Sequence, residues 1–262
     1  SRDFSRKARE LYKILFEPVK NKLPRGTTKL IISPDGLLSL LPFDVLASSD
    51  FNSGGSLKPI NYLLYDYEIS YTPSATIWHS KPGNYKKEWS VQFAGYANSY
   101  ANATFAVNRD LPLGDVQTQL TQLKYATMEV QKAFQYFSGS LFLDEKANES
   151  AFRTYGINSR ILHLALHALV DDKNPMRSML VFADSQNDSI NDGFLNAYEL
   201  YNMEITADLV VLSACNTGFG QVAKGEGVMS LSRAFAYAGS KSLVMSLWSA
   251  NDQATSTLME YF

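Results

Sequence analysis

The residues best suited to covalent chemistry are a cysteine and a histidine that each follow a largely apolar run. Cys215, the one cysteine among 262 residues, follows the run 209–213, and His167 follows the run 161–166. In an open parallel sheet, catalytic groups lie beyond the carboxyl ends of the strands. Two parallel strands here would therefore bring a thiol and an imidazole to the same edge. This arrangement predicts a nucleophile and its general base.

The sequence around Cys215 favours a reactive role, although a lone cysteine is more often a small buried hydrophobe. The segment 213–218 (Ser-Ala-Cys-Asn-Thr-Gly) is a small, polar turn, and three more glycines follow it by residue 227. Glycine lets a substrate carbonyl approach the backbone closely, and backbone amides can then stabilise an oxyanion. A single cysteine also forms no intrachain disulfide, as is typical of the reducing cytosol.

A second histidine, His163, forms a His-x-x-x-His pair with His167, a spacing that also occurs in helical zinc sites. However, the run 161–166 is apolar apart from His163, and no glutamate occupies the position of a zinc-peptidase base. We therefore predict that His163 is a buried, hydrogen-bonded strand residue that supports the site. We expect neither a metal nor another cofactor.

Strands that alternate with helices are expected to position these residues. Apolar runs at 161–166, 209–213 and 242–247 have the pattern of strands buried on both faces of a parallel sheet, with a shorter run at 179–183. A helix is predicted at 227–238, and the alternation favours an α/β sheet with helices on both faces. Further strands are expected at 29–33, 67–71, 91–94 and 141–143, and further helices at 3–22, 120–137 and 146–155.

Composition excludes several classes of partner. The formal net charge is only −2, so no bulk attraction to nucleic acid or to an anionic membrane is expected. No run approaches the roughly 18–20 apolar residues of a membrane helix. The N-terminus has no apolar segment behind its charges and does not resemble a signal peptide. These features predict a cytoplasmic protein.

Several long motifs match a known family. Two contain the histidines and the cysteine, at 161–168 (Ile-Leu-His-Leu-Ala-Leu-His-Ala) and 208–218 (Asp-Leu-Val-Val-Leu-Ser-Ala-Cys-Asn-Thr-Gly), and others lie at 30–43, 67–75, 225–239 and 246–252. Together they resemble the CHAT domain of the caspase and separase group from about residue 25 onward. Cys215 follows His167 by about 50 residues, as expected for caspases.

The resemblance implies a caspase-like α/β fold, a three-layer sandwich around a mostly parallel sheet. It implies a linker helix at 1–24, an N-terminal pseudo-caspase unit at 25–145 and a C-terminal protease unit at 146–262, which ends as if its last helix were cut. CHAT domains commonly follow tetratricopeptide repeats. The implied partners are therefore a protein or peptide substrate and such repeats, or another regulatory protein.

The resemblance also implies hydrolysis of peptide bonds through a thioester intermediate. Cys215 matches the nucleophile of the family and His167 its base. The backbone amides of Cys215 and Ala168 would form the oxyanion hole, with Ala168 where caspases carry glycine.

Three residues are implied to bind the substrate. Asp252 matches an acidic residue that, in separases, resembles the floor of the pocket for the arginine before the scissile bond. The other interpretation of Asp252 is a helix N-cap, a position that favours this residue type. Glu226 is a further pocket candidate, and Ser213 stands where metacaspases carry an aspartate.

Two other functions remain open at this point. One is a non-catalytic interaction or scaffold module in a signalling or defence complex, against which the retention of Cys215 and His167 argues. The other is an acyl or thioester hydrolase with the same dyad. The absence of a Gly-x-Ser-x-Gly elbow excludes only the serine version of that enzyme.

Overall fold

The computed structural model describes residues 2–49, 60–79, 88–101, 120–171, 173–183, 190–213, 226–246 and 251–262. The chain divides into two compact units, Ser1–Pro82 and Gly83–Phe262. The second unit contains both site histidines, the strand that leads toward Cys215 and the helix that begins at Asp252. The candidate site therefore depends on the fold of this unit.

In its described residues, the first unit has a small sheet and the α-helices α1 (Arg2–Leu15), α2 (Glu17–Lys20), α3 (Leu63–Asp66) and α4 (Ala75–His79). Its strands β1 (Lys29–Ile32) and β2 (Glu68–Tyr71) pair in parallel. The single helix expected over 3–22 is divided at Phe16. Pro18 lacks the N–H that a continuous helix needs, and it is tolerated here because it lies in the first turn of α2.

A five-stranded parallel sheet forms the centre of the second unit, in the order β10-β9-β5-β3-β4. Its strands are β3 (Val91–Ala97), β4 (Gly139–Leu143), β5 (Ser159–Ala165), β9 (Leu209–Leu212) and β10 (Ser242–Met245). The predicted parallel pairing of the strands before His167 and Cys215 is confirmed, because β5 and β9 are direct neighbours. Their carboxyl ends therefore meet at one edge of the sheet.

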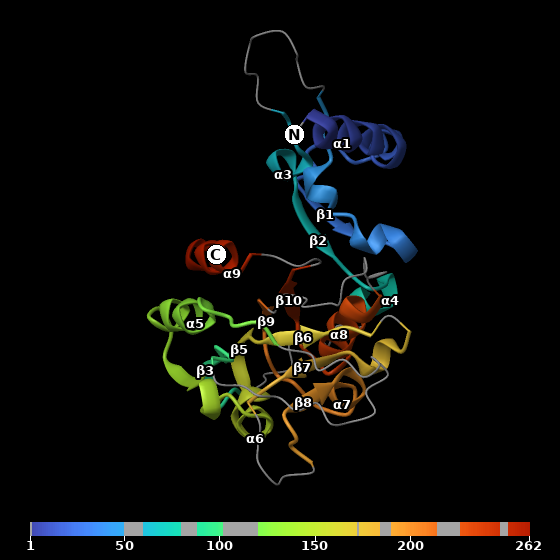
Figure 1. Cartoon of the computed structure of the whole chain (residues 1–262). Helices are drawn as coiled ribbons and strands as arrows, with labels where there is room; N and C mark the ends of the chain where they lie inside the picture. Colours follow the sequence, from blue (N-terminus) through green and yellow to red (C-terminus); the bar gives the residue numbers. More distant parts are fainter. Residues whose placement is uncertain are drawn as a thin grey trace. The chain divides into compact units, whose positions relative to one another are not determined.

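Helices cover both faces of this sheet (Figure 1). The α-helices in the described part of this unit are α5 (Ala126–Phe134), α6 (Glu149–Ala151), α7 (Ala197–Leu200), α8 (Glu226–Tyr237) and α9 (Asp252–Tyr261). Leu162 on β5 packs in one core with Phe235 of α8, whereas Ala165 packs in the other core with Val130 of α5. The predicted three-layer α/β arrangement is therefore confirmed. None of the helices in the described ranges is long and apolar enough to cross a membrane.

A small antiparallel sheet follows directly on β5, in the order β6 (His167–Leu169), β7 (Met179–Val181), β8 (Phe194–Asn196). β5 ends at Ala165, and His167 is the first residue of β6. Leu166 alone lies between the two strands. In the small sheet, His167 is the register partner of Val181 in β7.

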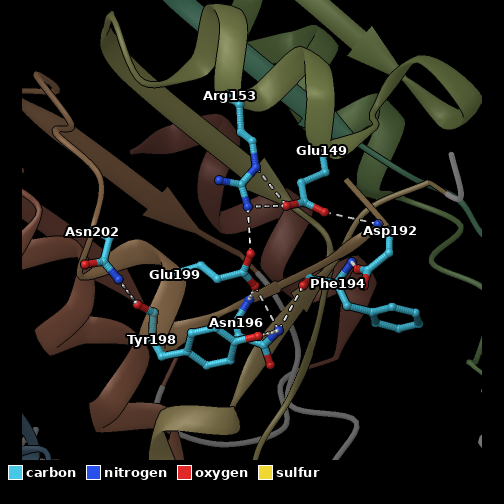
Figure 2. Close-up of polar contacts among 9 residues, drawn as sticks. Glu149, Arg153, Asp192, Phe194, Asn196, Tyr198, Glu199 and Asn202 are labelled. Carbon is cyan, nitrogen blue, oxygen red and sulfur yellow. Dashed lines mark hydrogen bonds and ion pairs between the residues drawn. The ribbon is translucent and has the colours of Figure 1, made fainter. Parts of the chain in front are cut away.

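A partly buried ionic network ties the small sheet to the helical layer (Figure 2). Arg153, in the π-helical turn Phe152–Gly156, donates to Glu149 Oε1 at 2.9 Å and to Glu199 Oε1 at 2.8 Å. The second oxygen of Glu149 accepts from the N–H of Gly193, just before β8. Glu149 is fully buried, and burial raises its pKa although the bonds from Arg153 oppose the shift. The network thus links α6 and α7 to the chain just before β8.

Strands from both sides of residue 146 belong to the same parallel sheet. β3 and β4 precede this position, and β5 follows it in register with β3, with Gly95 opposite His163. In the chain, the boundary between the two compact units instead falls between positions 82 and 83. The subdomains 25–145 and 146–262 are expected from the family resemblance and not from compactness, and they stay a prediction.

Candidate active site

The His167 imidazole is held in one orientation by a backbone carbonyl. The residue is fully buried, and its Nε2 lies 2.6 Å from the carbonyl oxygen of Thr121. A carbonyl oxygen only accepts, so Nε2 must carry the proton and donate it. Nδ1 is then the unprotonated nitrogen of the neutral ring. It is buried and has no hydrogen-bond partner within the part of the chain that the structure describes. The ring therefore presents a free basic lone pair.

The surroundings of His167 favour this neutral form. Burial lowers the pKa of His167, while the hydrogen bond to the Thr121 carbonyl and the negative charge of Asp252 act in the opposite direction. A histidine with a lowered pKa is unprotonated at neutral pH and can accept a proton from a nucleophile. This electrostatic setting matches the role of general base.

His163 lies on β5 and points toward α5. Its Nε2 is 2.7 Å from Oε1 of Glu129, and both side chains are buried. The ring also meets the edge of Phe93 at a centroid distance of 6.2 Å. The prediction of a buried, hydrogen-bonded strand histidine is confirmed, whereas its support of catalysis stays a prediction. Because the carboxylate accepts, Nε2 of His163 carries a proton and donates it to Glu129.

Sequence analysis missed Glu129, although a signal for it exists. It lies on the same helix face as Ala126 and Val130, which are both buried in the core. A charged residue within such an apolar stripe needs a buried partner, since an unpaired buried charge is costly. The polar residue on the facing strand, His163, is the partner that the pattern could have indicated.

Asp252 is tethered to a neighbouring segment rather than capping its own helix. Its Oδ2 accepts from the backbone N–H of Tyr125 at 2.9 Å. The N-cap of α9 is Asn251, whose side chain accepts from the N–H of Ala254 at 3.0 Å. The N-cap interpretation of Asp252 is therefore wrong, because Asn251 takes that position and Asp252 is the first helical residue. Asp252 remains close enough for its charge to act on His167.

The segment 120–125 connects Asp252 with His167. Sequence analysis assigned it to the helix 120–137, but α5 begins only at Ala126. Outside the helix, the Thr121 carbonyl binds His167 and the Tyr125 N–H binds Asp252. Both contacts use backbone groups, so no pattern of side chains could have indicated them.

The other predicted site residues lie on or near the same sheet edge, where they are described. Ala168 is buried in β6, opposite Leu180. Ser213 follows β9; its N–H donates to the Leu164 carbonyl at 3.2 Å, and its Oγ lies 3.5 Å from His163 Nε2. Glu226 is the first residue of α8, and its side chain is outside the described part, as is the whole of Cys215.

Comparison with protein-family models identifies a domain family for this chain. The family model for the CHAT domain matches residues 5–262, nearly the whole chain and both compact units. A search of the curated proteins found no match.

Proposed function

Since the chain belongs to the CHAT domain family, we propose that it is a cysteine endopeptidase that cleaves a protein substrate through a Cys215–His167 dyad. The CHAT domain is part of the caspase-like cysteine peptidase superfamily. The observation that carries the proposal is the unprotonated Nδ1 of His167, buried and without a partner among the described residues. His167 follows the carboxyl end of β5, and Cys215 follows the carboxyl end of β9, which is the neighbouring strand.

Chain connectivity supports a contact between the two residues. The N–H of Ser213 donates to the carbonyl of Leu164, so these two positions are adjacent. Cys215 follows Ser213 by two residues, a span of at most about 7 Å. His167 follows Leu164 by three residues. A thiol on so short a connection is within reach of the imidazole.

In the proposed reaction, Nδ1 of His167 accepts the thiol proton while Sγ of Cys215 attacks the scissile carbonyl carbon. The backbone amides of Cys215 and Ala168 stabilise the resulting oxyanion. When the C–N bond breaks, the imidazolium returns its proton to the leaving amine, and a thioester remains on Cys215. Water, deprotonated by the same nitrogen, then hydrolyses the thioester and regenerates the thiol. The Thr121 carbonyl keeps Nε2 protonated throughout and so holds the productive tautomer.

Asp252 is proposed to select a basic residue before the scissile bond. Its Oδ2 is occupied by the Tyr125 N–H, while no partner of Oδ1 is found in the described ranges. The carboxylate is partly exposed and its charge acts on His167, which suits a group at the floor of a neighbouring pocket. Glu226 and Ser213 are proposed as further lining residues. An arginine or lysine side chain would pair with the carboxylate that is otherwise only half satisfied.

The described site does not favour a non-catalytic interaction module. Burying a polar atom without a partner costs about 1–3 kcal/mol, and among the described residues Nδ1 of His167 has no partner. A scaffold gains nothing from this cost, whereas a general base requires the free lone pair. The proposed setting is the cytoplasm, with tetratricopeptide repeats or another protein as regulator.

Alkylation of the cysteine tests the dyad without knowledge of the substrate. Because Cys215 is the one cysteine, iodoacetamide consumption reports on it alone. A thiol paired with imidazole ionises well below the free value of about 8.5. We expect fast alkylation at about pH 6.5 that His167→Ala slows to the rate of an ordinary thiol. Equal rates in the two proteins would contradict the proposed pairing.

A further inference from the structure

Tyr100 has a strained backbone next to the site. It follows the carboxyl end of β3 and has a φ of 55°. Among the non-glycine residues that the structure describes, only Tyr100 and Asp144 have positive φ. The two are linked, since the N–H and Oγ of Ser99 both donate to Asp144 Oδ1, at 3.0 and 2.6 Å. Asn98 Oδ1 accepts from the Tyr100 N–H at 2.9 Å and closes the turn. Left-handed backbone is unfavourable for a bulky residue, so these bonds hold Tyr100 there against strain.

The strained turn places the phenol directly against His167. The two ring centroids are 4.5 Å apart, at an interplanar angle of 41°. The Tyr100 hydroxyl accepts from the backbone N–H of His167 at 3.0 Å and donates to the carbonyl of Val181. His167 and Val181 are register partners between β6 and β7. The hydroxyl therefore bridges the pair of residues that begins the small sheet.

The bridge also remains intact over the pH range in which a protease works. Tyr100 is buried, and burial raises the pKa of its hydroxyl above the ordinary value. The hydroxyl thus keeps its proton and continues to donate to Val181. The contact fixes both the backbone of His167 and the face of its ring, while the Thr121 carbonyl fixes the ring edge.

We propose that Tyr100 is a positioning residue that holds the His167 ring so that Nδ1 faces the thiol of Cys215. The catalytic meaning of this role rests on the proposed function, whereas the effect on His167 itself does not. In this role Tyr100 acts through the histidine, by its ring contact and its hydrogen bond to the His167 backbone.

The test compares two substitutions of the same kind on the same segment. Tyr100→Phe keeps the ring and removes only the bridging hydroxyl. Tyr96→Phe is the matched control, because Tyr96 is a fully buried residue of β3 whose hydroxyl donates to the Ala151 carbonyl at 3.0 Å in the other core. Tyr100→Phe loses the two hydrogen bonds to His167 and Val181, whereas Tyr96→Phe loses the one to Ala151, which is remote from His167. Urea unfolding of both shows whether their stabilities are comparable.

The main readout is the rate of Cys215 alkylation between about pH 5 and about pH 9, which spans the ordinary values of histidine and cysteine. We expect Tyr100→Phe to lower the rate near pH 6.5 by about 10–100-fold, as a small misplacement of a catalytic group does. The rate at the alkaline plateau, where the thiol ionises unaided, should not change. Tyr96→Phe should keep the wild-type profile. A wild-type profile in Tyr100→Phe, or an equal loss in Tyr96→Phe, would overturn the proposal.

An NMR titration of His167 separates this proposal from the proposed function. We expect Tyr100→Phe to move the pKa of His167 upward toward its ordinary value, because the loosened ring becomes better solvated, while Tyr96→Phe leaves it unchanged. If the wild type and His167→Ala were alkylated equally, the dyad would fail, yet this shift would still support positioning. An unchanged titration would refute the positioning role. Should Tyr100→Phe not fold, Asn98→Ala, which releases only the Tyr100 N–H, must show the same shift or the proposal falls.

Discussion

We expect Cys215→Ala to abolish peptide hydrolysis and His167→Ala to lower kcat by about 10³-fold or more, because the two residues act as a unit in the proposed reaction. Without the thiol no thioester forms, and without the imidazole neither the thiol nor the leaving amine exchanges its proton. Steady-state hydrolysis of a cleavable peptide measures both effects. The wild-type His167 ring is buried between Tyr100 and the Thr121 carbonyl, so its removal also affects packing. Thermal unfolding of His167→Ala is therefore the control for stability.

His163→Asn is the companion variant for the dyad experiment. It removes the imidazole that bonds to Glu129, so we expect lower stability and a partly reduced rate. Activity above a few per cent of wild type in Cys215→Ala would sink the assignment of the nucleophile. Complete loss in His163→Asn with an intact fold would mean that the two histidines have exchanged roles.

Asp252 should determine the preference for a basic residue before the scissile bond, and two substitutions separate its charge from its tether. Asp252→Asn removes the charge but keeps an oxygen that can accept from the Tyr125 N–H. Asp252→Ala removes both. If the charge selects the substrate, both variants lose about 10²–10⁴-fold in discrimination between a basic and an apolar residue.

The tether predicts a further difference between these two variants. Only Asp252→Ala leaves the Tyr125 N–H without its acceptor, so only this variant should also lose stability, by about 1 kcal/mol. It should also loosen the segment that carries the Thr121 carbonyl, and kcat should fall for every substrate. Profiling the three proteins on one peptide library gives kcat/KM for each residue. A wild type that prefers aspartate or an apolar residue, or an unchanged basic preference in Asp252→Asn, would leave Asp252 as a tether alone.

Much of the second unit could be predicted from the sequence because its strands are buried on both faces. The runs before His167 and Cys215 are almost wholly apolar, and such runs form parallel strands covered by helices. The helix 227–238 was predicted nearly at its observed bounds, Glu226–Tyr237, because its apolar spacing ends at a glycine. By contrast, the sequence places the start of α5 at residue 120, six residues before its observed start at Ala126. The segment 120–125 is not helical, and its backbone groups bind the side chains of His167 and Asp252.

Within the candidate site, the sequence predicts only those residues whose position in an apolar run marks them out. His163 follows from its place in the apolar run 161–166 and His167 from its place directly after that run, whereas the tautomer of His167 follows only from the Thr121 carbonyl. Tyr100 could not have been predicted, because its contact depends on a positive φ that the sequence does not indicate for a tyrosine. The position of Cys215 itself lies outside the described residues and stays a prediction.

The most direct test of the account is the reaction of the chain with peptidyl electrophiles that carry arginine, aspartate or leucine before the warhead, followed by mass spectrometry. The account predicts one adduct per chain, on Cys215, that forms fastest with arginine and only slowly in His167→Ala. It also predicts that the denatured chain shows no preference among the three peptides. No adduct, or equal and slow labelling of the native chain by all three, would contradict the claim that Cys215 and His167 form the site of a cysteine endopeptidase.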